Sequence, residues 1–126
     1  TSWCWDKDDE SRKFANQYFA KMKRMPTDVQ AADYSATMTY LKAVAAVKST
    51  DADKVMEYLK KTPIKDFYAK GGVIRPDGRM VHEMYLVQVK SLAESKKPWD
   101  YLKVLQTLPA DKVWTTKAES KCALWK

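Results

Sequence analysis

Apolar side chains recur at helical spacing near the start of the chain. They are Phe14, Tyr18, Met22 and Met25. An acidic run precedes them, and Asp8 or Asp9 can cap a helix there, because a carboxylate suits the positive end of the helix dipole. Pro26 cannot continue a helix. The pattern therefore predicts a first helix that runs up to Pro26.

Two further helices are predicted between residues 27 and 62. Over residues 27–48, two apolar stripes run along one helix, which indicates packing on more than one side. Thr27 or Asp28 can cap this helix, or an extended stretch over residues 28–31 can precede it. A shorter helix begins at the capping residue Asp51 and ends at Thr62-Pro63. Its apolar side is formed by Val55, Met56 and Leu59.

The stretch 71–89 predicts a β-hairpin. Arg75-Pro76-Asp77-Gly78 has the composition of a tight turn, because proline presets φ and glycine accepts a positive φ. Residues 84–89 are apolar on both alternating faces, so we expect this strand to be covered on both sides. Its expected partner is a strand in residues 99–108, a swapped segment, or both. Gly71-Gly72 is expected to relax the chain ahead of the hairpin.

Composition limits the class of protein. A chain of 126 residues, 45% of them hydrophobic, can form one domain with a core or a piece of a larger one. It has no apolar run of about 18 residues, so we expect no membrane span. It begins at Thr1, which fits a removed targeting segment or a start inside a longer protein. The net charge of +7 is spread along the chain, which favours a solvated surface over an anion-binding stripe.

No constellation typical of an enzyme or a metal site is visible. His82 is the only histidine and neighbours Glu83, but adjacent strand residues face opposite ways. We therefore expect a partly exposed strand residue rather than half of a catalytic dyad. The acidic run at residues 6–10 lacks a calcium-loop spacing and is interpreted as capping and solvation. We expect no enzymatic activity, no cofactor and no metal.

The two cysteines, Cys4 and Cys122, leave several interpretations open. A disulfide between them would tie the ends of the chain together in an oxidising compartment. Two unpaired thiols, or partners outside this chain, are the alternatives. Two cysteines and one histidine do not supply the four ligands of structural zinc.

Aromatic residues are the best candidates for ligand contacts. Those at segment ends or on the alanine-rich helix are Trp3, Trp5, Tyr34 and Tyr40. Core packing is their more common role. Trp5, however, stands where the chain enters a capped helix, and Val29 and Gln30 precede the next helix. Such junctions are where α/β folds place ligand contacts, so Trp5, Val29 and Gln30 are our candidate ligand-binding residues.

Several motifs, taken in order, resemble one family. They are Trp3-Cys4-Trp5, Met25-Pro26, Gln30-Ala31 with Tyr34-Ser35-Ala36, Leu41-Lys42-Ala43, Thr62-Pro63, residues 72–79, residues 84–90, Lys97-Pro98-Trp99-Asp100-Tyr101 and Glu119-Ser120-Lys121-Cys122. No single motif is diagnostic, but the ordered set covers nearly the whole chain. It is similar to the C-terminal third of a type I periplasmic solute-binding protein, in the branched-chain amino acid (Leu/Ile/Val-binding) family of ABC importers.

The resemblance implies an α/β fold of two lobes joined by crossing segments. This chain would be one partial domain, residues 1–126, from the C-terminal portion of that fold. Residues 1–70 would supply helices of the first lobe, and residues 71–126 would supply a hairpin and a strand near the hinge and the second lobe. Much of the ligand site would then lie outside this chain.

The resemblance also implies a secreted, periplasmic protein. It would bind an amino acid or a related small solute, aromatic acids included, between its lobes and deliver the solute to a membrane permease. Hinge closure is the implied motion, and periplasmic binding proteins are a well-known example of it. Trp5, Val29 and Gln30 match positions near the cleft. Cys122 matches a family cysteine whose partner would lie outside this chain.

The net charge motivates one alternative, a small basic module that binds nucleic acid or another polyanion. Its binding would weaken steeply as salt rises. We rank it below solute binding and expect no nucleic-acid partner. Because the strand at residues 84–89 lacks partners in this chain, we also expect exposed apolar surface and self-association by strand or segment exchange.

Overall fold

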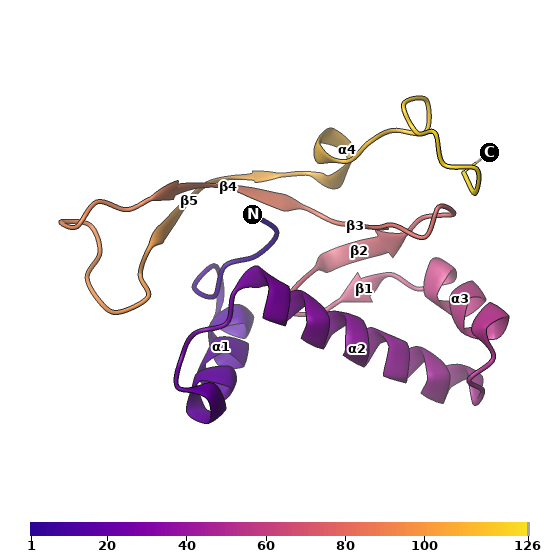
Figure 1. The fold of residues 1–126 in the computed structure, drawn as a ribbon, viewed down its shortest axis with the longest axis horizontal. Helices are drawn as coiled ribbons and strands as arrows, with labels where there is room; N and C mark the ends of the chain where they lie inside the picture. Colours follow the sequence, from indigo (N-terminus) through magenta and orange to yellow (C-terminus); the bar gives the residue numbers. More distant parts are fainter. Residues whose placement is uncertain (126) are drawn as a thin grey trace.

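The elements of the computed structural model, which describes residues 1–125, fall into two groups joined at His82 and Glu83 (Figure 1). The first group contains α1 (Asp9–Met22), α2 (Asp28–Val47), α3 (Ala52–Lys61), β1 (Ile64–Lys65), β2 (Lys70–Ile74) and β3 (Met80–Val81). The second group contains β4 (Met84–Val89), β5 (Leu102–Leu108) and α4 (Ala110–Val113). Strands β1, β2 and β3 form one antiparallel sheet, and β4 and β5 form another. Within residues 1–125, no helix combines the length and apolar character needed to cross a membrane.

Side-chain caps start the three long helices where the sequence predicts them. Asp8 accepts a hydrogen bond from the Ser11 backbone N–H at the start of α1, at 2.8 Å. Thr27 caps α2, and the side chain of Gln30 reaches back to complete a capping box. Asp51 caps α3 through the Lys54 N–H. These local contacts satisfy backbone donors that a helix leaves free at its first turn.

Helix α1 is shorter than predicted. Lys23 adopts a left-handed conformation, with φ of 57°, and its N–H donates to the Phe19 carbonyl. This cap ends the helix at Met22, so residues 23–25 continue as a loop before Pro26.

An aromatic cluster forms the main core beneath the N-terminal segment. The Trp3 side chain is 2% exposed and packs edge-on against Phe14 and Phe67. Phe14 and Phe67 stack with their ring centroids 4.1 Å apart. The indole N–H of Trp3 donates to Ser11 Oγ at 3.0 Å, so its polar atom is satisfied inside the core. A second, smaller cluster joins α2 and α3 through Ala43, Val55 and Leu59.

The predicted turn at residues 75–78 is confirmed, but the hairpin around it is short. The Gly78 N–H donates to the Arg75 carbonyl at 2.9 Å, and Gly78 has the positive φ that the turn requires. β3 ends at Val81, so the long second strand predicted for this hairpin is divided into β3 and β4. Gly71 and Gly72 lie inside β2 rather than ahead of it.

His82 is buried, which corrects the prediction of a partly exposed strand residue. Its side chain is 5% exposed and lies between the rings of Tyr68 and Trp114. Burial lowers the pKa of the imidazole, which favours the neutral form of the ring. The prediction failed because strand alternation was applied across a position where the chain leaves one sheet and enters another.

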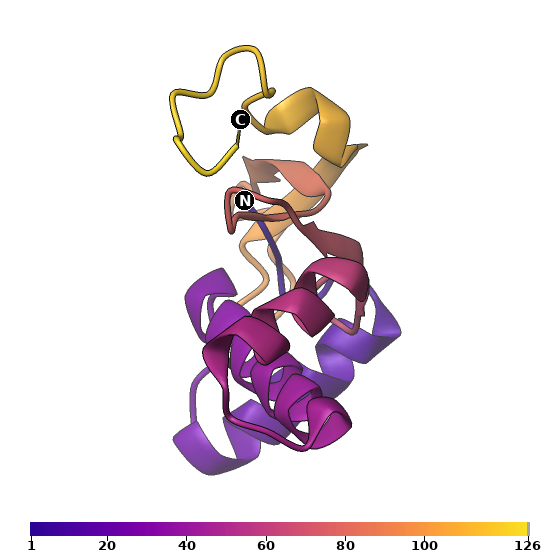
Figure 2. The same cartoon turned by 90° about the vertical axis from the view of Figure 1, so that its right-hand side faces the viewer.

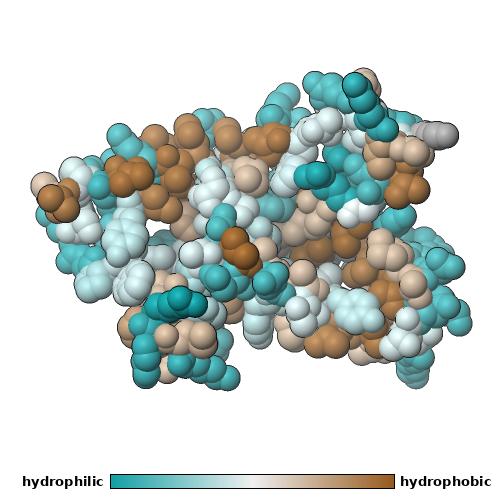
Figure 3. Space-filling view, viewed as in Figure 1, coloured by the Kyte–Doolittle hydropathy of each residue, from teal (hydrophilic) through white to brown (hydrophobic). Residues whose placement is uncertain are grey.

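Strand β4 pairs with β5, which confirms the expected pairing with the 99–108 stretch. The register runs from Met84 opposite Leu108 to Val89 opposite Leu102. Cover on both faces is not present in the described residues, because Leu86 and Val89 are 48% and 74% exposed. In Figure 3, apolar side chains gather over this two-stranded sheet, at the upper left.

Replacing Phe14 tests the aromatic core. We expect Phe14→Ala to lower the free energy of unfolding by about 3–5 kcal/mol, because it leaves a cavity between Trp3 and Phe67. Phe19→Ala, on the same helix but 37% exposed, is the matched control and should cost about 1 kcal/mol or less. Urea unfolding followed by tryptophan fluorescence measures both. Equal losses in the two variants would contradict the assignment of this core.

The outer edge of β5 should make the 126-residue chain self-associate. Its backbone has no strand beside it in the described sheet, and Val104 and Leu105 are exposed. The β4–β5 register skips Leu105, so Leu105→Lys adds a charge at this edge without removing a cross-strand pair.

Light scattering coupled to size-exclusion chromatography measures the effect. Leu105→Lys should shift the chain toward monomer, whereas Leu92→Lys, which alters a loop residue that is 97% exposed, should not. A monodisperse monomer of the unaltered chain at high concentration would refute the prediction.

Candidate functional site

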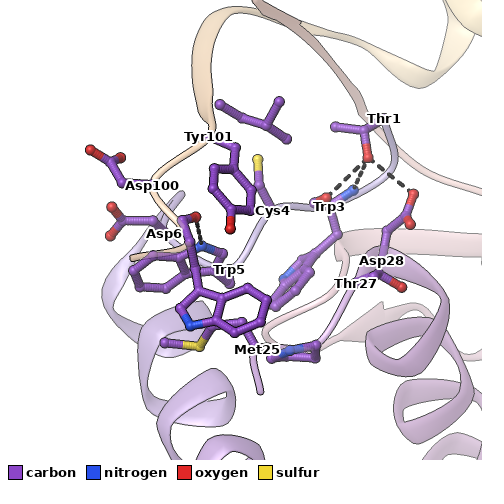
Figure 4. Close-up of a pocket in the computed structure, with 13 residues that line it drawn as sticks. Thr1, Trp3, Cys4, Trp5, Asp6, Met25, Thr27, Asp28, Asp100 and Tyr101 are labelled. Atoms are coloured by element: carbon purple, nitrogen blue, oxygen red, sulfur yellow. Dashed lines mark hydrogen bonds between the residues drawn. The ribbon is translucent and has the colours of Figure 1, made fainter. Parts of the chain in front are cut away.

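A cavity of about 260 Å³ lies where three segments meet (Figure 4). The N-terminal segment 1–6 contributes Trp3, Cys4 and Trp5 to its wall. The loop at residues 25–28 leads into α2, and the loop at residues 99–102 leads into β5. The wall therefore combines residues of both groups of elements, and most of it is apolar.

Trp5 links the two groups across this cavity. Its indole N–H donates to the carbonyl oxygen of Trp99 at 2.9 Å. The Lys97 ammonium lies 5.0 Å from the centre of the Trp5 ring, within the range of a cation–π contact. Trp99 has φ of 70°, a left-handed conformation that is uncommon for a residue with a side chain. Strained backbone of this kind is concentrated at ligand sites, which makes this loop a functional candidate.

Three carboxylates line the cavity, and two of them are paired with cations. Asp6 lies 3.2 Å from Arg12 Nη1 and 3.6 Å from Lys97 Nζ. Asp100 is almost buried and pairs with Lys90, and the hydrogen bond from Lys90 holds the pKa of Asp100 below its usual range.

The third carboxylate, Asp28, is paired with hydroxyl groups rather than with cations. Its Oδ2 accepts hydrogen bonds from Thr1 Oγ1 at 3.0 Å and from Ser2 Oγ at 3.1 Å. No lysine or arginine of residues 1–125 forms an ion pair with Asp28. A carboxylate held by two hydroxyl groups at an apolar cavity can accept a cationic group from a ligand.

The structure places the three candidate residues at the same end of the molecule but in different environments. Trp5 lines the cavity. Val29 and Gln30 follow Asp28 in the first turn of α2 and do not line it. The side chain of Val29 is 61% exposed, and Gln30 Oε1 accepts hydrogen bonds from the Thr27 backbone and hydroxyl groups. Gln30 therefore has a structural role in the helix cap.

Sequence reasoning missed most of the cavity wall, including Met25, Asp28, Trp99 and Tyr101. Two of them are aromatic residues flanking an acidic residue directly after Pro98, a local signal that could have marked the loop. Their approach to Trp5 could not be read from the sequence, because more than ninety positions separate them from it.

The remaining aromatic candidates separate into core and surface. Trp3 is core, the role considered more common, and only part of it reaches the cavity wall. Tyr34 and Tyr40 on α2 are about half exposed and lie outside the cavity.

Neither the cysteines nor the acidic residues form a covalent or metal centre in the described residues. Cys4 and Cys122 are free thiols, so a bond between them is not part of this structure. Cys4 lines the cavity, and burial raises the pKa of its thiol. Within residues 1–125, no group of three or more histidine, cysteine or acidic side chains is placed to hold a metal ion.

Comparisons with known proteins identify the family. The family model described as periplasmic binding protein matches residues 1–97. A crystal structure of a periplasmic binding protein from Burkholderia mallei shares 60% identity and a TM-score of 0.96, covering 99% of this chain and 33% of that one. A branched-chain amino acid ABC transporter periplasmic ligand-binding protein from Burkholderia xenovorans shares 44% identity and a TM-score of 0.96, covering 100% of this chain and 34% of that one.

A more distant structure supports the fold alone. An amino acid ABC transporter substrate-binding protein from Pseudomonas fluorescens is 23% identical, with a TM-score of 0.78, and the match covers 94% of this chain and 32% of that one. No curated protein matches the chain. The chain thus spans about a third of the length of the solved structures that it resembles. The family match and the two closer structures confirm the resemblance drawn from the ordered motifs, and the chain belongs to the periplasmic binding protein family.

Proposed function

We propose that this chain is part of the solute-binding component of an ABC importer, a C-terminal portion that forms one wall of the ligand site. The solute is an amino acid or a related small molecule. The observation that carries the proposal is the cavity at Trp5, which lies between two groups of elements joined by a short crossing. The solved relatives are about three times as long as this chain, and we infer that the corresponding further residues complete the site.

The chemistry of the cavity supports a solute with an amino group and an apolar body. Trp5, Trp99 and Tyr101 provide flat apolar walls. Asp28 offers a carboxylate that the described cations leave free for an ammonium group. Val29 and Gln30 begin the same helix, and the exposed side chain of Val29 is available to a ligand held against that helix terminus.

We place the crossing between the lobes at His82 and Glu83. There the chain passes from β3 to β4, and Thr1 exchanges two backbone hydrogen bonds of 2.9 Å with Tyr85 beside it. Residues 1–81 would belong to the first lobe and residues 84–125 to the second, a later boundary than the one expected at residues 70 and 71. Hinge closure about this crossing would bring the lobes together on the solute.

The family supports a periplasmic location and a membrane permease as the partner that receives the solute. The polyanion-binding alternative has less support at this site. The cavity wall contains three carboxylates and no lysine or arginine, which is the reverse of what a phosphate backbone requires.

Asp28→Asn tests the proposed solute class. The complete gene product containing these residues is titrated with the proteinogenic amino acids and with aromatic acids lacking an amino group. We expect the variant to bind the preferred amino acid about 10- to 100-fold more weakly, the effect of losing one charge-assisted hydrogen bond. Isothermal titration calorimetry measures the dissociation constants.

Asp33→Asn, an exposed residue of the same helix, removes the same charge and should leave affinity unchanged. Equal affinity in wild type and Asp28→Asn would remove Asp28 from the site. Binding of aromatic acids but of no amino acid would overturn the assignment of an amino group to the solute, and failure of both sets to bind would overturn the proposed function.

A further inference from the structure

The C-terminal segment of the chain returns from the second group of elements onto the first. Residues 114–125, here called the strap, follow α4 and lie over the turn between β2 and β3 (Figures 1 and 2). The geometry points to a conformational role: the strap fixes the angle between the two sheets across His82 and Glu83. The two ends of the strap contact Arg75 in the β2–β3 turn and His82 at the junction of the sheets.

Arg75, in the β2–β3 turn, holds the far end of the strap. Its guanidinium forms a two-pronged pair with Asp77, with Nη2 2.7 Å from Oδ2. That pair orients the group so that Nη1 donates to the Thr115 carbonyl at 2.7 Å. The same guanidinium lies 3.8 Å from the centre of the Trp125 ring. One side chain of the β2–β3 turn therefore contacts the strap both near its beginning and at its end.

Trp114 holds the near end at the crossing itself. Its indole N–H donates to the backbone carbonyl of His82 at 2.6 Å, and its ring packs on the buried imidazole of His82. The Arg79 guanidinium lies 5.5 Å from the Trp114 ring. The residue where the chain changes sheets is thus fixed by the segment that follows the second sheet.

The strap has internal structure of its own. Glu119 accepts hydrogen bonds from the backbone and hydroxyl groups of Thr116, at 2.9 and 2.8 Å. The Ser120 N–H donates to the Thr116 carbonyl, and the Trp125 N–H donates to the Cys122 carbonyl. These turns hold Trp114 and Trp125 at a defined separation, which lets both ends contact the hairpin at once.

The position of the strap gives it control over the angle between the sheets. In Figure 1 the cavity side, with the 90–101 loop, lies to the left of the crossing, and the strap lies to the right. The backbone connection between the groups is only two residues long. A rotation about His82 that alters the spacing at Trp5 must therefore move Trp125 relative to Arg75. Most side chains of the strap are exposed, so release uncovers little apolar surface.

Distance measurements by pulsed electron–electron double resonance test whether the strap fixes the angle between the sheets. Spin labels are placed on exposed residues of the two groups, Lys60→Cys on α3 and Gln88→Cys on β4, in a Cys4→Ser, Cys122→Ser background. Labelled protein is diluted with unlabelled protein to suppress distances between molecules. Trp125→Ala, which leaves the Arg75–Asp77 pair intact, and Arg75→Gln should both shift and broaden the distance distribution.

Lys112→Gln is the matched control, because it removes a cation from the neighbouring α4 without touching the turn, and it should leave the distribution unchanged. Circular dichroism checks that each variant keeps its secondary structure. If Arg75→Gln unfolds the turn, the distance distribution of Trp125→Ala is the one that tests the strap. An unchanged distance distribution in folded Trp125→Ala protein would overturn the proposal that the strap fixes the angle between the sheets. The result does not depend on the solute, so it is independent of the proposed function.

Discussion

Burial of Trp3 fixes the N-terminal segment, residues 1–6, which contacts both groups of elements. Its indole is enclosed by Phe14 and Phe67 and is hydrogen-bonded to Ser11, so it can move little without opening the core. Thr1, two residues earlier, is thereby held against Tyr85 of β4. Trp5, two residues later, is held against the Trp99 loop. One buried aromatic residue thus supports both the crossing and the cavity wall.

The second group of elements depends on such point contacts because it has little core of its own. The largest exposed apolar side chains of β4 and β5 include Leu86, Val89 and Leu105, so this sheet contributes surface rather than interior. It is placed by the Thr1–Tyr85 exchange, by the Trp5–Trp99 hydrogen bond and by the strap at Arg75. The position of this sheet therefore depends on a few polar and aromatic contacts rather than on a large buried apolar interface.

The cavity and the strap are two results of the same arrangement. The indole N–H of Trp5 donates to the backbone carbonyl of Trp99 in the second group, and that of Trp114 donates to the carbonyl of His82, where the two groups join. Tryptophan suits this role because its ring packs on apolar surface while its single donor fixes an orientation. If the hinge closure proposed above occurs, these two indole contacts lie on either side of the connection that would bend.

Local signals in the sequence determined the helices, because a cap and its backbone partners lie within three residues of each other. Asp8, Thr27 and Asp51 start α1, α2 and α3 where their side chains predict, and the tight turn at Gly78 follows from the same short-range chemistry. The ordered motifs also determined the family, because the order of residue types along the chain can be recognised without knowing which residues are in contact. Tertiary structure alone decided the burial of His82, the division of the hairpin and the meeting of Trp5 with Trp99. Each depends on where the chain changes sheets, a choice made by packing between segments far apart in the chain, which strand periodicity does not encode.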